Sequence, residues 1–593
     1  MMHRTFLRCL LLLCLGALGP CQAQQLDAGS RIYNQGILSS GASLHASRPG
    51  GTELSGQQAA CVSCHRPSGM GSVEGNTRIP PISGSFLFPS ADHLTIANTD
   101  GIRGKSLKYA RTVYSDDALR LALGKGVNVQ GRQLGELMPR YQLNDDDFLA
   151  LKAYLAQLSV EPSPGVTKEN IRFATVITPD VSQERRAIFL DMLHSVVLAK
   201  NSSTSPRKRY MTSAANFITQ SERKWDVDVW ELTGAPSTWP AQLDALYAKN
   251  PVFALLSGLS DGAWEPVDAF CANRHIPCWF PSVKAPPKRA ESGFGLYFSS
   301  GLVLDARVLA NHLQAPGAAK LRRVTQVYMP DTPGADSAGV LRSAWTAAAP
   351  QLTNLPVADG GDKKLASLLK DAAPTDALVL WLKPEQLLPR LNAMQPTAAT
   401  LYIAAPLWAD ADIAQLPEPW RQRVKIAYPY ELPHMRRANL AYLHSWLKLR
   451  GLPLVDEVLQ SELFFSLNLM TDTLQDMIDN MYRDYLVERT EDNLGKRETS
   501  KAEQENRDRQ VLGRLGRASV ASEAAKGSEI SEAADALSAQ QRAFGVGVSY
   551  GTTVYPRLTL APGQHFASRG AYVLGVADLG AEPMGDAPVW IVP

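Results

Sequence analysis

Cys61-Val62-Ser63-Cys64-His65 is the stretch that most tightly constrains this 593-residue chain. Two thiols at C-x-x-C spacing on one helical turn can form thioether bonds to the two vinyl groups of a haem. The adjacent His65 would then face the iron as its proximal ligand. The alternative is a cysteine pair that is oxidised or binds zinc, but a zinc site needs about two further ligands. Neither a second Cys-x-x-Cys nor a nearby His-x-x-x-His is present. The motif therefore predicts one covalently attached haem c.

The N-terminal residues predict export. Arg4 and Arg8 form a short basic region, residues 10–18 are apolar, and Cys21-Gln22-Ala23 offers a cleavage site after a small residue. We therefore expect residues 1–23 to be a signal peptide and the protein to be periplasmic. An uncleaved membrane anchor is disfavoured because the apolar run is short for a span, and no later run reaches that length. Export also suits the motif, because c-type haem is attached outside the cytoplasm.

The remaining cysteines pose a separate question. Of the seven in the chain, three belong to the signal peptide and two to the haem motif. Cys271 and Cys278 are left, and an oxidising compartment favours a disulfide between them. A disulfide requires the two Cα atoms to lie within about 7 Å. Two buried thiols are therefore the open alternative.

Length and charge limit the number of domains and the classes of partner that the chain can have. At 593 residues the chain is too long for a single core and should divide into several domains. The formal net charge is +2, and it falls to about zero once the signal peptide is removed. This balance argues against nucleic acid or a broad anionic membrane surface as a partner.

Residues 24–160 carry further features expected around a haem. Ile79-Pro80-Pro81-Ile82 is a rigid turn that can present a backbone carbonyl to His65 Nδ1. Met138, before a helix predicted over 145–158, is the first candidate for the sixth iron ligand. Met70 is an alternative, although it follows His65 by only five residues, and the lone His93 is another.

The C-x-x-C-H motif, the Pro-Pro turn and Met138-Pro139-Arg140-Tyr141 occur in the order found in the class I monohaem cytochromes c, which this segment resembles. The resemblance implies an all-α domain with His65 and Met138 as axial ligands. It also implies one-electron exchange with a redox partner such as a dehydrogenase, another cytochrome or a terminal oxidase. An iron with both axial positions filled favours electron transfer over oxygen or peroxide chemistry.

The pattern changes after a linker at residues 161–167. In residues 168–593, short β-branched runs alternate with helical stretches, which is typical of an α/β fold with parallel sheets. Two such sets, on either side of about residue 305, predict two lobes. The predicted strands are 171–177, 224–232, 252–256, 277–280, 323–328, 377–382, 401–405 and 424–428, and the predicted helices are 183–200, 240–249, 264–274, 337–348 and 384–394.

Four stretches of this half resemble the type 1 periplasmic binding proteins, the amino-acid-binding group of ABC transport systems. They are residues 252–258, 296–301, 555–564 and 567–572. The resemblance implies a cleft that closes on a small-molecule ligand by hinge motion. Ligands of open α/β sheets lie outside the carboxyl ends of the strands. The predicted pocket residues are therefore Ser257, Gly258, Tyr297 and Trp381.

Residues 488–543 depart from that family, because they are rich in Glu, Lys, Arg, Ser and Ala. Such a composition predicts a solvated helix or a disordered insertion. The fused haem segment is a second departure, and it weakens the case for simple solute delivery.

The motifs leave three functions open. No G-x-S-x-G, Walker A or H-E-x-x-H motif is present, so we assign no catalytic residue and expect no enzyme. The first function is an electron-transfer protein with a module that binds a small molecule or a partner. The second is a solute-binding protein or ligand sensor in which haem is accessory. The third is an accessory electron acceptor of a periplasmic dehydrogenase. In each case we expect the segments on either side of the linker to fold independently.

Overall fold

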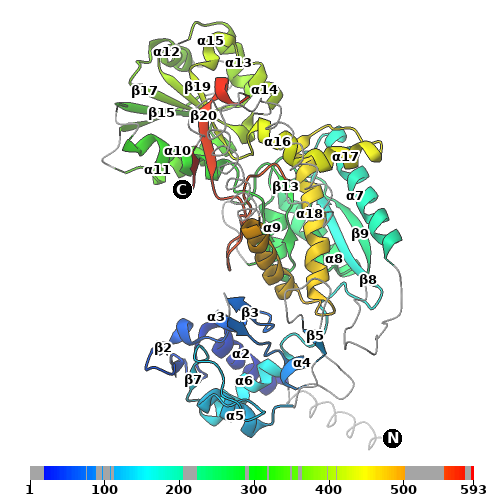
Figure 1. Cartoon of the computed structure of the whole chain (residues 1–593). Coiled ribbons are helices and arrows are strands. Elements are labelled where there is room, and N and C mark those ends of the chain that lie inside the picture. The colour runs from blue at the N-terminus through cyan, green and yellow to red at the C-terminus, as the bar shows by residue number, and fades with distance from the viewer. Residues whose placement is uncertain are drawn as a thin grey trace, which may run out of the picture. The chain divides into compact units, whose positions relative to one another are not determined.

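The computed structural model divides into two compact units, which Figure 1 traces along the chain. The first comprises Met1–Ile171, Thr204–Lys224 and Thr471–Arg489, and the second comprises Arg172–Ser203, Trp225–Met470 and Thr490–Pro593. The residues that the structure describes are 19–74, 77–88, 96–97, 107–108, 113–204, 223–287, 293–316, 320–346, 350–357, 363–396, 398–408, 410–500, 553–580 and 589–593. His93, most of the predicted signal peptide and residues 501–543 lie outside them.

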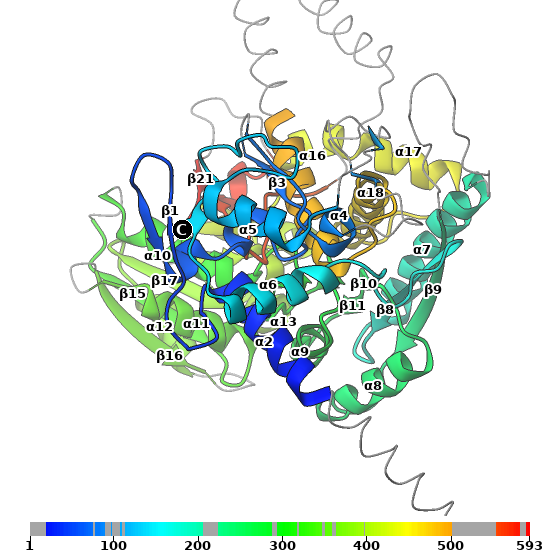
Figure 2. The ribbon, with the colours of Figure 1, turned by 90° about the horizontal axis from the view of Figure 1, so that it is seen from below.

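Helices build most of the first unit: α2 (Gly19–Gln35), α3 (Val62–His65), α4 (Gly84–Leu87), α5 (Asp116–Lys125) and α6 (Asp145–Gln157). Side chains cap the last two, because Ser115 accepts a bond from Ala118 N and Asn144 accepts one from Asp147 N. Helices α2 and α6 pack together (Figure 2). Their close approach depends on Gly29, where an added Cβ would lie 2.1 Å from the carbonyl oxygen of Ala150.

Short strands correct the expectation of an all-α haem segment. Strands β1 (His45–Ser47), β2 (Glu53–Ser55) and β7 (Arg140–Tyr141) form an antiparallel sheet in the order β2-β1-β7. Two further hairpins pair β3 (Ser72–Glu74) with β4 (Thr77–Ile79), and β5 (Ile96–Ala97) with β6 (Leu107–Lys108). The backbone N–H and C=O groups of these loops thus find hydrogen-bond partners in neighbouring loops.

The first unit also reaches beyond the predicted boundary at residue 160. Ser163, in the predicted linker, donates its N–H to the carbonyl of Met481 at 3.0 Å. Its Oγ accepts a bond from the N–H of Arg483 at 3.1 Å. The segment Thr471–Arg489, far along the chain, therefore belongs to the same unit as the haem motif.

A parallel sheet forms the first lobe of the second unit, in the order β13-β11-β8-β10-β12-β14, with β9 also paired to β8. Its strands are β8 (Asn170–Ile177), β9 (Lys224–Glu231), β10 (Ala254–Leu256), β11 (Leu259–Ser260), β12 (Cys278–Trp279), β13 (Ser282–Val283) and β14 (Gly295–Leu296). The helices of this part of the chain are α7 (Gln183–Ser203), α8 (Trp239–Lys249), α9 (Glu265–Arg274) and α18 (Glu457–Met477).

The second lobe is a sheet in the order β16-β15-β17-β18-β19-β20-β21, parallel as far as β19 and antiparallel beyond it. Its strands are β15 (Arg323–Tyr328), β16 (Gln351–Pro356), β17 (Asp376–Trp381), β18 (Thr400–Ala404), β19 (Val424–Tyr428), β20 (Ala571–Gly575) and β21 (Trp590–Ile591). The helices in this stretch are α10 (Leu302–Gln314), α11 (Pro333–Ser343), α12 (Lys363–Asp371), α13 (Pro384–Asn392), α14 (Asp410–Ala414), α15 (Glu418–Arg421), α16 (Pro433–Asn439) and α17 (Ala441–Leu449). Single 3-10 turns are η1 (Gly56–Ala59), η2 (Pro236–Thr238), η4 (Ala405–Leu407) and η5 (Val576–Asp578).

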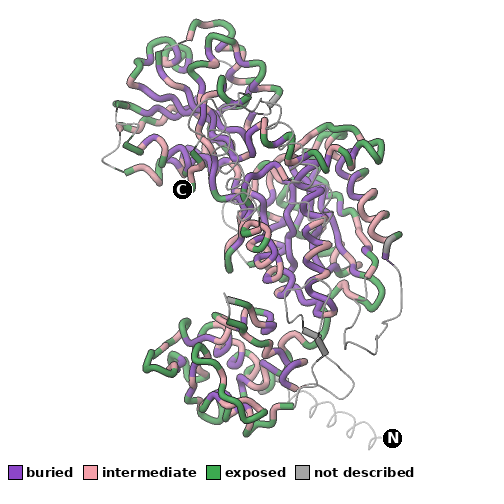
Figure 3. Tube along the Cα trace, viewed as in Figure 1, coloured by how far each residue is buried: buried purple, intermediate pink, exposed green. Residues whose placement is uncertain are grey.

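Helices cover both faces of this second sheet. Figure 1 shows α10 and α11 on one side, with α12, α13 and α15 on the other. A separate apolar cluster fills each interface, one around Leu309 and Leu341 and one around Leu369 and Trp420. Figure 3 shows the strands as the most buried part of each lobe. The two-lobed α/β prediction is confirmed.

The chain passes between the lobes three times. The first passage follows β14, as predicted near residues 296–301, the second leads from β19 to α18, and the third returns to β20. Tyr297 exchanges two backbone bonds with the third passage, accepting from Ala567 N at 2.9 Å and donating to His565 O at 2.7 Å. Glu431 of the second passage donates its N–H to Val554 O at 2.6 Å. The three passages are thus hydrogen-bonded to one another.

The start of the charged stretch differs from the solvated segment that the sequence predicts. Residues 483–500 are helical, and Glu488, Glu491, Asn493 and Leu494 are buried. Within the described ranges, no helix is both long and apolar enough to cross a membrane.

Candidate functional site

One turn of helix places the three residues of the motif together. The N–H of Cys64 and that of His65 both bond the carbonyl of Cys61, at 3.2 and 2.9 Å, which closes the turn that becomes α3. Cys61, Cys64 and His65 all line a cavity of about 320 Å³. Burial raises the pKa of the Cys61 thiol to about 12. The motif therefore presents two thiols and an imidazole to the same space.

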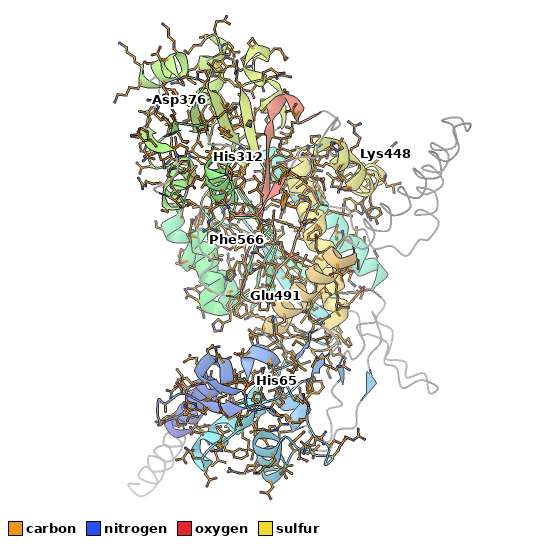
Figure 4. All side chains as sticks on the ribbon, turned by 60° about the vertical axis from the view of Figure 1, so that its left-hand side comes forward. His65, His312, Asp376, Lys448, Glu491 and Phe566 are labelled. Atoms are coloured by element: carbon orange, nitrogen blue, oxygen red, sulfur yellow. The ribbon has the colours of Figure 1, made fainter. Side chains whose placement is uncertain are left out.

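His65 is held in one orientation by the Pro-Pro turn. Its Nδ1 donates to the carbonyl of Pro80 at 3.0 Å, so the predicted backbone partner is confirmed and Nε2 is left to act as a ligand. Burial lowers the pKa of His65 to about 4, so the ring is neutral near pH 7, as iron ligation requires. Gly71 permits this approach, because a Cβ there would lie 2.1 Å from the carbonyl oxygen of Ile79. Figure 4 labels His65 among the side chains of this unit.

The structure separates the two methionine candidates. Met138 lines the cavity together with His65. Met70 is buried elsewhere: its sulfur lies 3.8 Å from Ser83 Oγ, and it is not among the described residues that line the cavity. The third candidate, His93, lies outside the described residues. The cavity thus brings His65 and Met138 together.

Arg48 is a residue of this site that sequence reasoning did not select. It lines the cavity, and its Nε is buried without a hydrogen-bond partner among the described residues. A guanidinium in that position suits a carboxylate, because ionised pairs make the strongest hydrogen bonds. It lies 13 residues before the motif, and no spacing rule connects the two.

The residues present fit a haem c. Apolar side chains from the Pro-Pro turn, α4, α5, β7 and α6 form most of the walls of the cavity. They are Ile79, Pro80, Pro81, Ile82, Leu87, Leu119, Leu123, Tyr141, Leu151 and Leu155. Two thiols and a neutral imidazole come from α3, a thioether comes from Met138, and Arg48 supplies the counter-charge for a carboxylate. A flat apolar macrocycle with two vinyl and two propionate groups matches this set of donors and walls.

The predicted pocket residues of the second unit lie in its core instead. Tyr297 is fully buried and its hydroxyl donates to Asp268 at 2.5 Å. Trp381 is also buried, and its Nε1 donates to Gln326 at 3.2 Å. Ser257 and Gly258 do follow β10, but the Ser257 hydroxyl bonds Phe280 O at 3.4 Å and Gly258 lies against Trp264. These four positions therefore pack within the lobes in this structure, and their role in a ligand pocket stays a prediction.

For Cys271 and Cys278 the sequence left two alternatives open, and in the structure no disulfide joins them. Cys271 lies within α9 and Cys278 on β12, and both are fully buried in the same apolar cluster. The second alternative, two buried thiols, describes the structure. Each thiol packs as a small apolar side chain in this core, which is stabilised by the burial of apolar surface.

A comparison with known protein families agrees with the haem site of the first unit. Residues 51–159 match the family model for cytochrome c, so the chain carries a cytochrome c domain. Such a domain implies covalently bound haem c. Among curated proteins, none matches this chain.

Solved structures resemble the other part of the chain. A branched-chain amino acid ABC transporter protein from Rhodospirillum rubrum is 12% identical, with 54% of this chain and 89% of that chain covered and a TM-score of 0.41. A fatty acid ABC transporter substrate-binding protein from Thermomonospora curvata is 14% identical, with 56% and 83% covered and a TM-score of 0.39. An ABC transporter substrate-binding protein from Desulfitobacterium hafniense is 13% identical, with 55% and 89% covered and a TM-score of 0.39.

Proposed function

We propose that this protein is a periplasmic electron-transfer protein that carries one haem c and a second module for a small molecule or a partner protein. The observation that carries the proposal is the cavity shared by Cys61, Cys64, His65 and Met138. When bound, the haem supplies one-electron exchange between the ferric and ferrous states of its iron.

Each residue of the site has a distinct task in this proposal. Cys61 and Cys64 fix the position of the group through two thioethers. His65, oriented by Pro80, would hold the haem iron through Nε2, and Met138 would supply its sulfur as a second ligand. Arg48 binds a propionate. The apolar walls exclude water, which limits the change in solvation when the charge of the site changes.

The first experiment tests covalent attachment. The protein is purified after export in a strain that attaches c-type haem, denatured, and extracted with acid acetone. We expect the colour to stay with the wild-type protein and to be released from the double variant with Cys61→Ala and Cys64→Ala. Haem that extracts freely from the wild-type protein would refute the assignment.

The second module is proposed to bind a small molecule or a redox partner. The support is its topology, because two largely parallel sheets joined by three hydrogen-bonded passages form the kind of hinge that closes around a ligand.

For the first unit we propose electron exchange with a dehydrogenase, another cytochrome or a terminal oxidase. The test is the rate at which a candidate dehydrogenase reduces the haem, compared between the wild-type protein and Met138→Ala, which lacks the proposed second iron ligand. Equal reduction rates for both would argue against a specific electron-transfer route.

A further inference from the structure

A buried carboxylate binds the loop that follows the haem motif. The N–H of Ser68 donates to Glu488 Oε1 at 2.7 Å, and the Ser68 hydroxyl donates to Glu488 Oε2 at 2.5 Å. Ser68 is fully buried and Glu488 is only 5% exposed. Hydrogen bonds to an ionised group in a dry environment are strong, and this carboxylate receives two from a single residue. The contact lies within the first unit, although the residues are 420 positions apart.

Ser68 is the centre of the loop between His65 and Gly71. The Ser68 hydroxyl also accepts a bond from Met70 N at 3.1 Å, and its carbonyl accepts one from Ser159 Oγ at 2.6 Å. At the end of the loop, Gly71 donates its N–H to the carbonyl of His65 at 3.2 Å. A shift of Ser68 would therefore be transmitted to the backbone of His65 through a short closed loop.

The surroundings of Glu488 allow it to titrate near neutral pH. Burial raises the pKa of Glu488 to about 8, while the hydrogen bonds from Ser68 and the charge of Arg66 oppose the rise. The charge of Asp484, on the same helical segment, raises the pKa of Glu488 further. Tyr33 of α2 also faces the carboxylate, and burial raises the pKa of that phenol well above its ordinary value. With a pKa of about 8, the Glu488 carboxyl changes its charge close to neutral pH.

We propose that Glu488 is a positioning residue of the haem site, which anchors the loop after His65 through Ser68 and links electron uptake by the site to proton uptake. The proposal rests on the proposed haem site. One electron from the redox partner lowers the positive charge of the site by one. The Glu488 carboxylate then takes one proton from solvent more readily, and it releases that proton when the electron leaves.

The experiment measures the midpoint potential of the haem-loaded full chain by optical redox titration from about pH 6 to about pH 10. In the wild-type protein we expect the potential to fall as the pH rises through the titration of Glu488. Glu488→Gln keeps the shape of the side chain and an acceptor for Ser68 N, but it has no charge. We expect its potential to lose this fall and to exceed the wild-type value at high pH. Asp145→Asn is the matched control, because Asp145 is in the same unit and its side chain is 86% exposed.

A second variant separates anchoring from a general loss of structure. Ser68→Ala removes the hydroxyl that stabilises the carboxylate, so we expect the fall in potential to move to higher pH while the covalent haem is retained. The inference is overturned if Glu488→Gln keeps the wild-type pH dependence, if Asp145→Asn loses it as well, or if Ser68→Ala leaves its midpoint unmoved. Acid-acetone extraction of each variant tests haem attachment separately, so failure of the proposed function is distinguishable from failure of this inference.

Discussion

Replacing Glu462 should make the stability of the second unit less sensitive to pH. Glu462 lies on α18, is 7% exposed, and accepts a bond from the Tyr555 hydroxyl at 2.7 Å. Burial raises the pKa of Glu462 from 4.5 to about 7. A carboxyl whose pKa is raised by folding stabilises the fold fully below its unfolded pKa, and that contribution is lost as the pH rises through the folded pKa.

The magnitude follows from these two pKa values. Between about pH 4 and about pH 8, the wild-type protein should lose about 3 kcal/mol of unfolding free energy relative to Glu462→Gln. For a unit of this size, that difference is on the order of 4 °C in Tm. At the acidic end Glu462 is protonated and resembles glutamine, so the two proteins should differ there by a constant offset only.

The assay is calorimetric unfolding of both proteins at a series of pH values, following the transition of the second unit. Asp244→Asn serves as the control, because Asp244 pairs with Arg274 at the surface and is 51% exposed. The quantity of interest is the Tm difference between variant and wild type at each pH. A difference for Glu462→Gln that stays constant from acid to alkaline pH would refute the reasoning, as would an equal change for Asp244→Asn.

Three further predictions concern the site, the helix crossing and the cysteines. Met138→Ala should lower the midpoint potential and allow carbon monoxide to bind the ferrous protein, as absorption spectroscopy would show; an unchanged spectrum and potential would return attention to His93. Gly29→Ala should destabilise the first unit by about 1–3 kcal/mol, because the new methyl group meets the Ala150 carbonyl, and denaturant titration of the haem absorbance would measure it. Thiol titration of the unfolded, unreduced protein should find Cys271 and Cys278 both reactive, whereas two unreactive cysteines would reveal a disulfide.

Secondary structure was largely predictable because the strands of this chain are short runs rich in β-branched and apolar residues. Residues 323–328 and 424–428 are strands with the predicted bounds, and most of their residues are buried. The haem motif was equally accessible, because the spacing of two thiols and a histidine has a chemical meaning without reference to the rest of the chain. Local patterns therefore predicted the elements and the cytochrome c domain.

What the sequence could not predict depends on contacts between distant residues. Nothing near Glu488 distinguishes it from the other acidic residues of its charged stretch, and the hydrogen bonds that it accepts come from Ser68, 420 positions earlier. Tyr297 and Trp381 follow or end strands, where ligands bind in many α/β folds, but a strand end does not reveal which way an aromatic side chain turns. Here both turn to buried partners, Asp268 and Gln326.

The discontinuity of the first unit also orders the events of biosynthesis. During synthesis the haem motif is made long before residues 471–489, which complete the same unit. Joining Ser68 to Glu488 closes one of the longest loops available in this chain, and contacts of such high sequence separation form slowly. Covalent haem attachment can therefore precede completion of the unit. A lesion that delays folding of the C-terminal half should then yield coloured protein whose haem segment is sensitive to proteolysis.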